Sequence, residues 1–318
     1  MDQRTERAAD SHAAGAAARR ALAGRLGLDI PRGWWPTPAI VKGIEAGGFA
    51  WVQVHAPPAD VLVDRERASR HACSLRAVLD TGSLRLVLHG PDTLSAGTPE
   101  ADRALHGLLG YAVAAGAEIV VYHGANFALC DGGAAASGFR ERVAAEERSL
   151  RAAAPRVEAL GLLLVIENLA PVWPGPPRLC HDAAAVRTLV RRTGSPAVRM
   201  LFDVGHANIV GGGAARLLGP VLADVGLFHL HDNLGDRRGD EPARGGLDPL
   251  RLDLHLPPGA GTAPWHDLAP LLLDGAAPLV LEVPPPHRPD PVALAAVTAE
   301  LLLRGWGAGA GDVAAAAA

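Results

Sequence analysis

The chain has 318 residues, of which 49% are hydrophobic and 20% are charged, so a sizeable core can form and disorder over the whole length is excluded. Its 30 Lys and Arg residues against 34 Asp and Glu residues give a formal net charge of -4. This balance disfavours a generic electrostatic binder of nucleic acid or of an anionic membrane. Schiff-base chemistry, which needs a lysine amine, has almost no candidate because Lys42 is the only lysine.

The cysteines and the N-terminal residues indicate the cellular compartment in which the protein resides. Cys73, Cys130 and Cys180 lie far apart and form no C-x-x-C pair, which argues against a disulfide framework or a thiolate zinc site. Residues 1–24 are rich in Ala and Arg but lack the apolar core of a secretory signal. Nowhere do the roughly 18 to 20 uninterrupted apolar residues of a membrane span occur. We therefore expect a soluble, cytoplasmic protein without a membrane partner.

Short apolar runs alternate with longer stretches that are compatible with helices, a pattern typical of βα units with a parallel sheet. Most central runs are apolar almost throughout, as expected of parallel strands that are buried on both faces. The composition indicates an N-terminal tail or frayed helix over 1–24, one domain over 25–306 and a low-complexity tail over 307–318. In chain order the predicted strands are 25–30, 49–55, 84–89, 117–123, 161–167, 198–203, 226–231 and 278–283.

The last seven predicted strands share a polar ending. Because all strands of a (β/α)8 barrel point the same way, their carboxyl ends form one face, where active sites are found. An open doubly wound sheet would not gather eight strand ends, and no G-x-G-x-x-G motif follows an early strand. We therefore predict an α/β fold, a (β/α)8 TIM barrel. The side chains expected at its rim are His55, His89, His123, Glu167, Asp203, His229 and Glu282.

These side chains indicate a metal. Neutral imidazoles and carboxylates are the ligands that divalent first-row metals accept, and so many of them on one rim need a compensating cation. Two short patterns reinforce the prediction: FDVGH contains Asp203 and His206, and DLH contains Asp253 and His255. The DLH pattern lies within residues 232–263, an unusually long connection, and long ordered loops in such domains are usually functional.

The same motifs resemble those of the xylose isomerase-like TIM barrels, which include sugar phosphate isomerases and epimerases and the metal-dependent apurinic-site endonucleases. The resemblance covers about residues 25–306, through VIENLAP, FDVGHANIVGG, LFHLHDNLGD, DLHLPPGAGTAPW and PLVLEVP. It implies one divalent ion, such as Mn, Zn, Co or Mg, and it implies that Glu167 and Glu282 are also the catalytic acid and base. The four ligands that it implies are Glu167, Asp203, His229 and Glu282.

Further ligands are implied by the endonuclease members, and His231, two residues after His229, is a candidate for an additional metal or substrate contact. The resemblance favours a metal-dependent isomerase or epimerase that acts on a small polyol, ketose or sugar phosphate through an enediolate. A related dehydratase and a multinuclear phosphodiesterase similar to the endonucleases are the alternatives. The residues that match the additional endonuclease ligands are His89, His123, His206, Asp253 and His255.

Nucleic acid is disfavoured as a partner by the segment after His89. In the endonucleases the matching segment carries an aromatic and an apolar residue that enter the DNA stack, whereas here Asp92 occupies it and would face phosphates. A binding barrel without catalysis is the third alternative, since fold does not imply function. The sequence leaves the substrate, the metal and the oligomeric state open, a homo-oligomer included.

Overall fold

Eight parallel strands, hydrogen-bonded in chain order, close into a barrel because β1 pairs with β8 as well as with β2. The computed structural model describes residues 22, 24–128, 134–171, 177–235, 253–287 and 290–316. Each predicted strand is present, with bounds shifted by at most a few residues. The strands are β1 (Leu26–Asp29), β2 (Trp51–His55), β3 (Arg85–His89), β4 (Ala117–Tyr122), β5 (Leu163–Glu167), β6 (Val198–Asp203), β7 (Val225–Leu230) and β8 (Leu279–Leu281).

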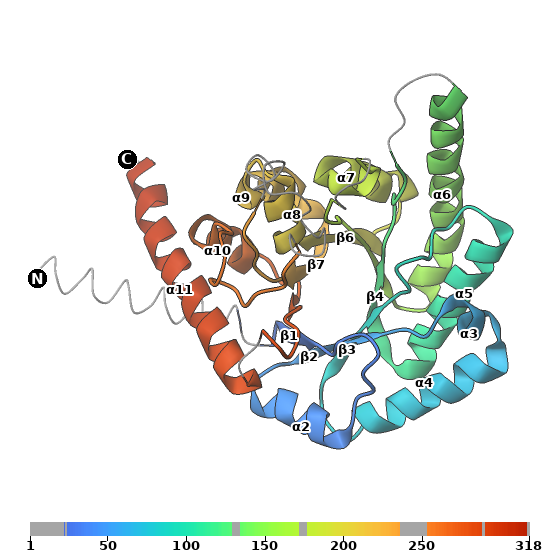
Figure 1. Ribbon diagram of the computed structural model, residues 1–318, viewed down its shortest axis with the longest axis horizontal. Helices are drawn as coiled ribbons and strands as arrows, with labels where there is room; N and C mark the ends of the chain where they lie inside the picture. Colours follow the sequence, from blue (N-terminus) through green and yellow to red (C-terminus); the bar gives the residue numbers. More distant parts are fainter. Residues whose placement is uncertain are drawn as a thin grey trace, which may run out of the picture.

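Helices lie around the strands and connect each strand to the next (Figure 1). This arrangement confirms the predicted (β/α)8 TIM barrel. The helices are α2 (Pro38–Ala46), α3 (Ala59–Val63), α4 (Arg65–Leu79), α5 (Pro99–Ala115), α6 (Ala134–Ala159), α7 (Ala183–Thr193), α8 (Val204–Val210), α9 (Ala214–Leu218), α10 (Trp265–Asp274) and α11 (Pro291–Ala316), with short 3-10 turns at η1 (Leu179–His181) and η2 (Gly219–Asp224).

Local sequence signals explain several helix boundaries. Thr37 and Thr98 each accept a hydrogen bond from the first turn of the helix that follows, α2 and α5, and a proline stands at the first helical position of both. At the end of α5, Gly116 adopts φ 80°, a left-handed conformation that a glycine accepts without strain. The connections that carry the site residues are therefore set by short-range chemistry at the strand and helix ends.

The C-terminal segment differs from the sequence expectation. Residues 307–318 are predicted as a low-complexity tail, but α11 continues from Pro291 to Ala316. Alanine has the highest intrinsic helix propensity, which explains why an Ala-rich run extends the last helix of the barrel. Of the predicted N-terminal tail, residues 1–21 and 23 lie outside the described residues. In the part of the chain that the structure describes, no helix has the length and apolar character needed to cross a membrane.

The inside of the barrel has two layers. One is a cluster of buried apolar side chains that includes Val165 on β5 and Leu201 on β6. Side chains in a strand point to the same face every second residue, so the residues two positions later, Glu167 and Asp203, point into the barrel as well. The second layer, at the carboxyl ends of the strands, is therefore polar, and it forms the floor of the candidate site.

Candidate metal centre

Four side chains from four strands make up the centre of the polar layer: Glu167 on β5, Asp203 on β6, His229 on β7 and Glu282 after β8. His229 Nδ1 is 3.3 Å from Oε1 of Glu167, 3.3 Å from Oε1 of Glu282 and 3.7 Å from Oδ2 of Asp203. Glu167, Asp203 and His229 are at most 1% exposed. The residues predicted as a four-ligand set thus converge on one ring nitrogen, and we refer to them as the central group.

A second group lies on the β3 and β4 side of the central group and shares Glu167 with it. Oε2 of Glu167 is 3.0 Å from Nε2 of His123 and 3.7 Å from Nε2 of His89. The two Nε2 atoms of His89 and His123 are themselves 3.2 Å apart. Two ring nitrogens that face each other at this distance need a proton or a cation between them.

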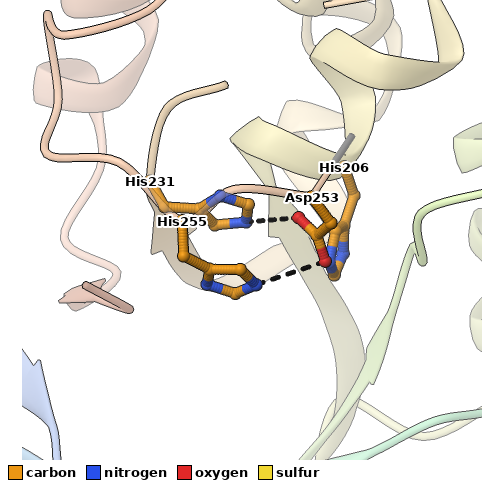
Figure 2. A group of neighbouring side chains, drawn as sticks. All are labelled: His206, His231, Asp253 and His255. Carbon is orange, nitrogen blue, oxygen red and sulfur yellow. Dashed lines mark hydrogen bonds and ion pairs between the residues drawn. The ribbon is translucent and has the colours of Figure 1, made fainter. Parts of the chain in front are cut away.

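A third group, drawn in Figure 2, combines the end of the barrel with the loop after β7: His206, His231, Asp253 and His255. Oδ2 of Asp253 is 3.3 Å from Nε2 of His206 and 3.2 Å from Nε2 of His255. His231 Nε2 is 3.0 Å from Oδ1 of Asp203 and 3.8 Å from Oδ1 of Asp253. His231 therefore links the third group to Asp203 of the central group.

Several of these histidines have their orientation fixed by a hydrogen bond on the far ring nitrogen. Nδ1 of His89 donates to the carbonyl of Gly90, Nδ1 of His206 to that of Asn168, and Nδ1 of His255 to that of Glu282, at 2.8, 2.9 and 2.8 Å. In each case the opposite nitrogen, Nε2, faces the carboxylates. Such outer hydrogen bonds orient metal-binding imidazoles, so the three rings direct Nε2 toward the site.

Gln53 performs the same task for His229, and sequence reasoning missed it. It is fully buried on β2, where it accepts a hydrogen bond from Nε2 of His229 at 2.8 Å and donates from its amide to Glu282 Oε1 at 2.6 Å. The same amide nitrogen donates to Asp29 at 3.1 Å. The available signal was a lone Gln inside the apolar run FAWVQVH, since a buried polar group needs partners.

The described part of the long loop is held by Asp232, directly after β7. Its carboxylate accepts hydrogen bonds from the backbone N–H groups of Asn233, Gly259 and Ala263 and from the indole of Trp265, at 2.7 to 3.0 Å. A Cβ at Gly261 would lie 2.1 Å from the carbonyl oxygen of Asn233, so that turn requires glycine. These contacts fix the segment that carries Asp253 and His255, and sequence reasoning missed Asp232 as well. Residues 236–252 of the loop lie outside the described residues.

The buried carboxylates of the polar layer need positive charge beside them. Burial would raise the pKa of Glu167, but His229 and His123 hold it well below its usual range. Burial disfavours a charged ring at His229, yet Glu282 and Glu167 outweigh it and raise the pKa to about 9. Buried carboxylates at this density are stable only beside a cation. Bare imidazole nitrogens and carboxylate oxygens are ligands of divalent metals, so the donor set fits such an ion.

Two rim residues take other roles. His55 belongs to none of the metal-competent groups among the described residues, and its Nε2 lies 3.2 Å from Asp29. Asp92 forms an ion pair with Arg32, and its Oδ1 is 3.7 Å from Nδ1 of His123. Burial opposes the charge of Asp92, but Arg32 and the neighbouring histidines lower its pKa.

Glu167 and Glu282 of the central group line a cavity of about 410 Å³, together with side chains of the two flanking groups: His89, His123, His206, Asp253 and His255. Arg32 and Asp92 contribute to one side and Leu254 and Pro284 to another. A cavity of this size lies within the range of small-ligand sites, and it opens at the carboxyl ends of the strands, as active sites of this architecture do.

Comparison with known proteins agrees with this architecture. The sequence profile of the xylose isomerase-like TIM barrel family matches residues 42–303. The chain belongs to this family. This confirms the resemblance derived from the sequence motifs. No curated protein matches the sequence.

Several solved structures share the fold. A D-tagatose 3-epimerase-like protein superposes with a TM-score of 0.64 at 17% identity, covering 87% of this chain and 97% of that one. The 3-keto-D-glucoside 4-epimerase of E. coli does so with a TM-score of 0.60 at 18% identity, covering 87% and 98%. An L-ribulose 3-epimerase has a TM-score of 0.60 at 17% identity, covering 91% and 97%. At these identities the likeness extends to the fold alone.

Proposed function

We propose that this barrel is a divalent-metal-dependent isomerase or epimerase that acts on a small sugar-like substrate, a polyol, ketose or sugar phosphate. The observation that carries the proposal is the central group, in which carboxylates from the ends of β5, β6 and β8 surround one nitrogen of His229 at 3.3 to 3.7 Å. The fold likeness to sugar epimerases is consistent with it.

Glu167 and Glu282 are suited to move the proton. They come from strands that do not neighbour each other, β5 and β8, so their carboxylates approach the space above His229 from two directions. One removes a proton from the carbon beside the sugar carbonyl, and the other returns it or protonates the adjacent oxygen. A divalent ion such as Mn, Zn, Co or Mg, held by Glu167, Asp203, His229 and Glu282, would stabilise the negative charge that develops on the sugar oxygens.

The remaining site residues hold this pair in place. Gln53 fixes the ring of His229, and Asn168 links the ends of β5 and β6 because its amide donates to the carbonyl of Asp203 at 3.1 Å and its oxygen accepts from the N–H of Asp203 at 2.9 Å. The histidines of the two flanking groups, together with Asp253, offer hydrogen-bond partners to sugar hydroxyls on both sides of the centre.

A second candidate function is a multinuclear phosphodiesterase. The observation that favours it is that further metal-competent groups lie beside the central one, among them His89–His123–Glu167 and His206–His231–Asp253–His255. Several ions could then activate water and bind the leaving oxygen. Asp92, which lines the cavity, and the overall net charge of -4 both disfavour a nucleic-acid partner.

Deuterium exchange separates the two functions. The protein, purified without chelator, is incubated in D2O with ketoses and sugar phosphates, and solvent deuterium at the carbon beside the carbonyl is followed by NMR. Because an acid or base contributes roughly 10² to 10⁴-fold, E167Q and E282Q should each lower the exchange rate by at least about 100-fold. Retained exchange in both variants contradicts the assignment of the two glutamates.

Metal content per chain, measured by elemental analysis, is the companion measurement. About one ion that is lost in E167A supports the isomerase or epimerase. Two or three ions, with the extra ones lost in D253A and with phosphodiester cleavage in place of deuterium exchange, support the hydrolase. A protein that takes up no metal under any loading condition contradicts both.

A further inference from the structure

A second cavity adjoins the metal centre on the side of the first three strands. Its volume is about 560 Å³, larger than the 410 Å³ above the central group. Arg32, His55 and Asp92 line both cavities, so the two spaces meet at these side chains. We call the second cavity the annex. The proposed reaction at the metal centre uses none of its outer walls.

The outer wall of the annex is formed by Trp34 and Trp35, which follow β1. Trp34 is 54% exposed and Trp35 is 41% exposed, although large aromatic side chains are normally mostly buried. Trp35 is held from behind, because its ring packs edge-on against His71 at 4.8 Å and His71 is hydrogen-bonded through Nδ1 to the hydroxyl of Tyr111 at 2.7 Å. Two exposed indoles in one cavity, one of them supported from behind, indicate a binding surface.

The inner wall is polar and faces the centre. Arg32 forms an ion pair with Asp92, and their side chains remain 56% and 39% exposed. His55, which takes no part in the metal-competent groups, completes this boundary. A wholly apolar ligand would use the indoles but would make no polar contact with these groups, of which Arg32 and Asp92 are partly exposed. A sugar ring offers both an apolar C–H face for an indole and hydroxyl groups for a guanidinium, a carboxylate and an imidazole.

We propose that the annex binds a second ring of the substrate, so that the preferred substrate is a disaccharide or other glycoside rather than a free monosaccharide. This inference rests on the proposed function, since it places the reacting sugar at the central group and the attached ring over Trp34 and Trp35. The continuity of the two cavities at Arg32, His55 and Asp92 sets the direction in which the glycosidic bond runs.

Calorimetric titration of the metal-loaded protein tests the proposal. The ligands are glucose, fructose and galactose, each compared with disaccharides that contain it (sucrose, maltose, cellobiose and lactose) and with phenyl β-D-glucopyranoside. At least one glycoside should bind about tenfold more tightly than its monosaccharide, an effect of the size expected for one well-placed aromatic contact. Equal or weaker binding of every glycoside overturns the proposal.

The tryptophan variants assign the preference to the annex. W34A and W35A should reduce glycoside affinity to that of the monosaccharide and leave monosaccharide affinity unchanged, whereas W34F should retain most of the preference. V113A, which truncates an exposed apolar side chain on the outer helix α5, is the control and should behave as the wild type. A preference that survives in both W34A and W35A overturns the proposal.

Two further measurements distinguish a sugar ring in the annex from a defective metal centre and from a second copy of this chain. Metal content should be the same in W34A as in the wild type. If W34A loses the preference for glycosides while its metal content is unchanged, the preference depends on the annex. If the wild type takes up no metal, the proposed function is contradicted. Sedimentation of the wild type and W34A detects a second copy seated on the indoles. A dimer that W34A dissociates, without any glycoside preference in the wild type, overturns the proposal.

Discussion

The inside of the barrel changes character within two residues along the same strands. In the lower layer, Val165, Leu201 and Leu227 belong to one buried apolar cluster. Two residues later, which is about 6.6 Å along a parallel strand, the upper layer has Glu167, Asp203 and His229. The same relation holds for the other inward pairs: Trp51 and Gln53, Val87 and His89, Val121 and His123, and Val280 and Glu282.

The two layers are stabilised by different interactions. The lower layer is stabilised by burial of apolar surface and by dispersion contacts, which need no partner chemistry. The upper layer contains buried carboxylates and imidazoles whose desolvation is unfavourable unless each has a hydrogen bond and a counter-charge. The comparison indicates that the lower layer contributes to stability and that the upper layer needs counter-charges and orienting hydrogen bonds. Both layers lie on the same strands, and they differ only in the identity of their side chains.

The first way to break this comparison is to create a cavity in the lower layer. Leu227 is fully buried in that cluster, so L227A should lower the free energy of unfolding by about 2 to 5 kcal/mol, as buried Leu-to-Ala changes do. Urea unfolding measures the loss, with V113A on the surface as the control. Metal content per folded chain should not change. A matching loss of metal would show that the lower layer also sets the geometry of the upper one.

The fold and most of the candidate ligands could be predicted from the sequence because both follow from local patterns. A buried parallel strand is a short apolar run, and the first polar residue after it lies at the barrel rim. This is why Glu167, Asp203 and His229 can be located from their strands alone. The pairing of Asp253 with His206 and His255 follows from the family motifs, and the structure brings these residues together.

The supporting residues could not be predicted, because they act across long sequence separations. Gln53 contacts His229, 176 residues away, and Asp232 contacts Trp265 across the long loop. Asp92 forms an ion pair with Arg32, 60 residues away, and lies near His123. Nothing in the local pattern around these residues indicates their partners.

Glu146, on α6, is a buried carboxyl outside the barrel, so it can be compared with the buried carboxylates of the upper layer. It accepts hydrogen bonds from the hydroxyl of Tyr122 and, at 2.9 Å, from the N–H of Ala125. Burial raises its pKa from 4.5 to about 7, although Tyr122, Ala125 and Arg142 favour the charged form. Without the imidazoles of the upper layer, this carboxyl is therefore more stable when protonated.

The pKa shift of Glu146 predicts the pH dependence of stability. Its folded pKa is above its unfolded value, so its contribution is complete below pH 4.5 and is lost as the pH rises through 7. Between pH 5 and pH 8 the wild type should lose roughly 2 to 3 kcal/mol of unfolding free energy relative to E146Q. Urea unfolding of both proteins at the two pH values measures this difference. Parallel pH profiles for the two proteins would mean that Glu146 stays ionised in the fold.

The smallest expected effect concerns the hydrogen bonds that orient the upper layer. Q53M keeps the length of the side chain but removes the acceptor for His229 Nε2 and the donor to Glu282. Loss of such an outer contact typically weakens metal binding by about 10 to 100-fold. Competition with a calibrated chelator measures the dissociation constant, and thermal unfolding of the metal-free protein checks the fold. Asn126, whose carboxamide oxygen pairs with Arg178 outside the barrel interior, supplies the control variant N126A, which should bind metal as the wild type does.

An unchanged dissociation constant in Q53M would be informative about the whole layer. It would mean that the three carboxylates around His229 Nδ1, at 3.3 to 3.7 Å, orient the ring by themselves. The central group would then be set by its own charges, and the polar residue on β2 would serve only to satisfy Asp29 and Glu282. A weakened constant at unchanged stability would instead show that a neutral amide on another strand of the barrel sets the position of the ligand. In that case the distinction between the two layers depends on hydrogen bonds as well as on charge.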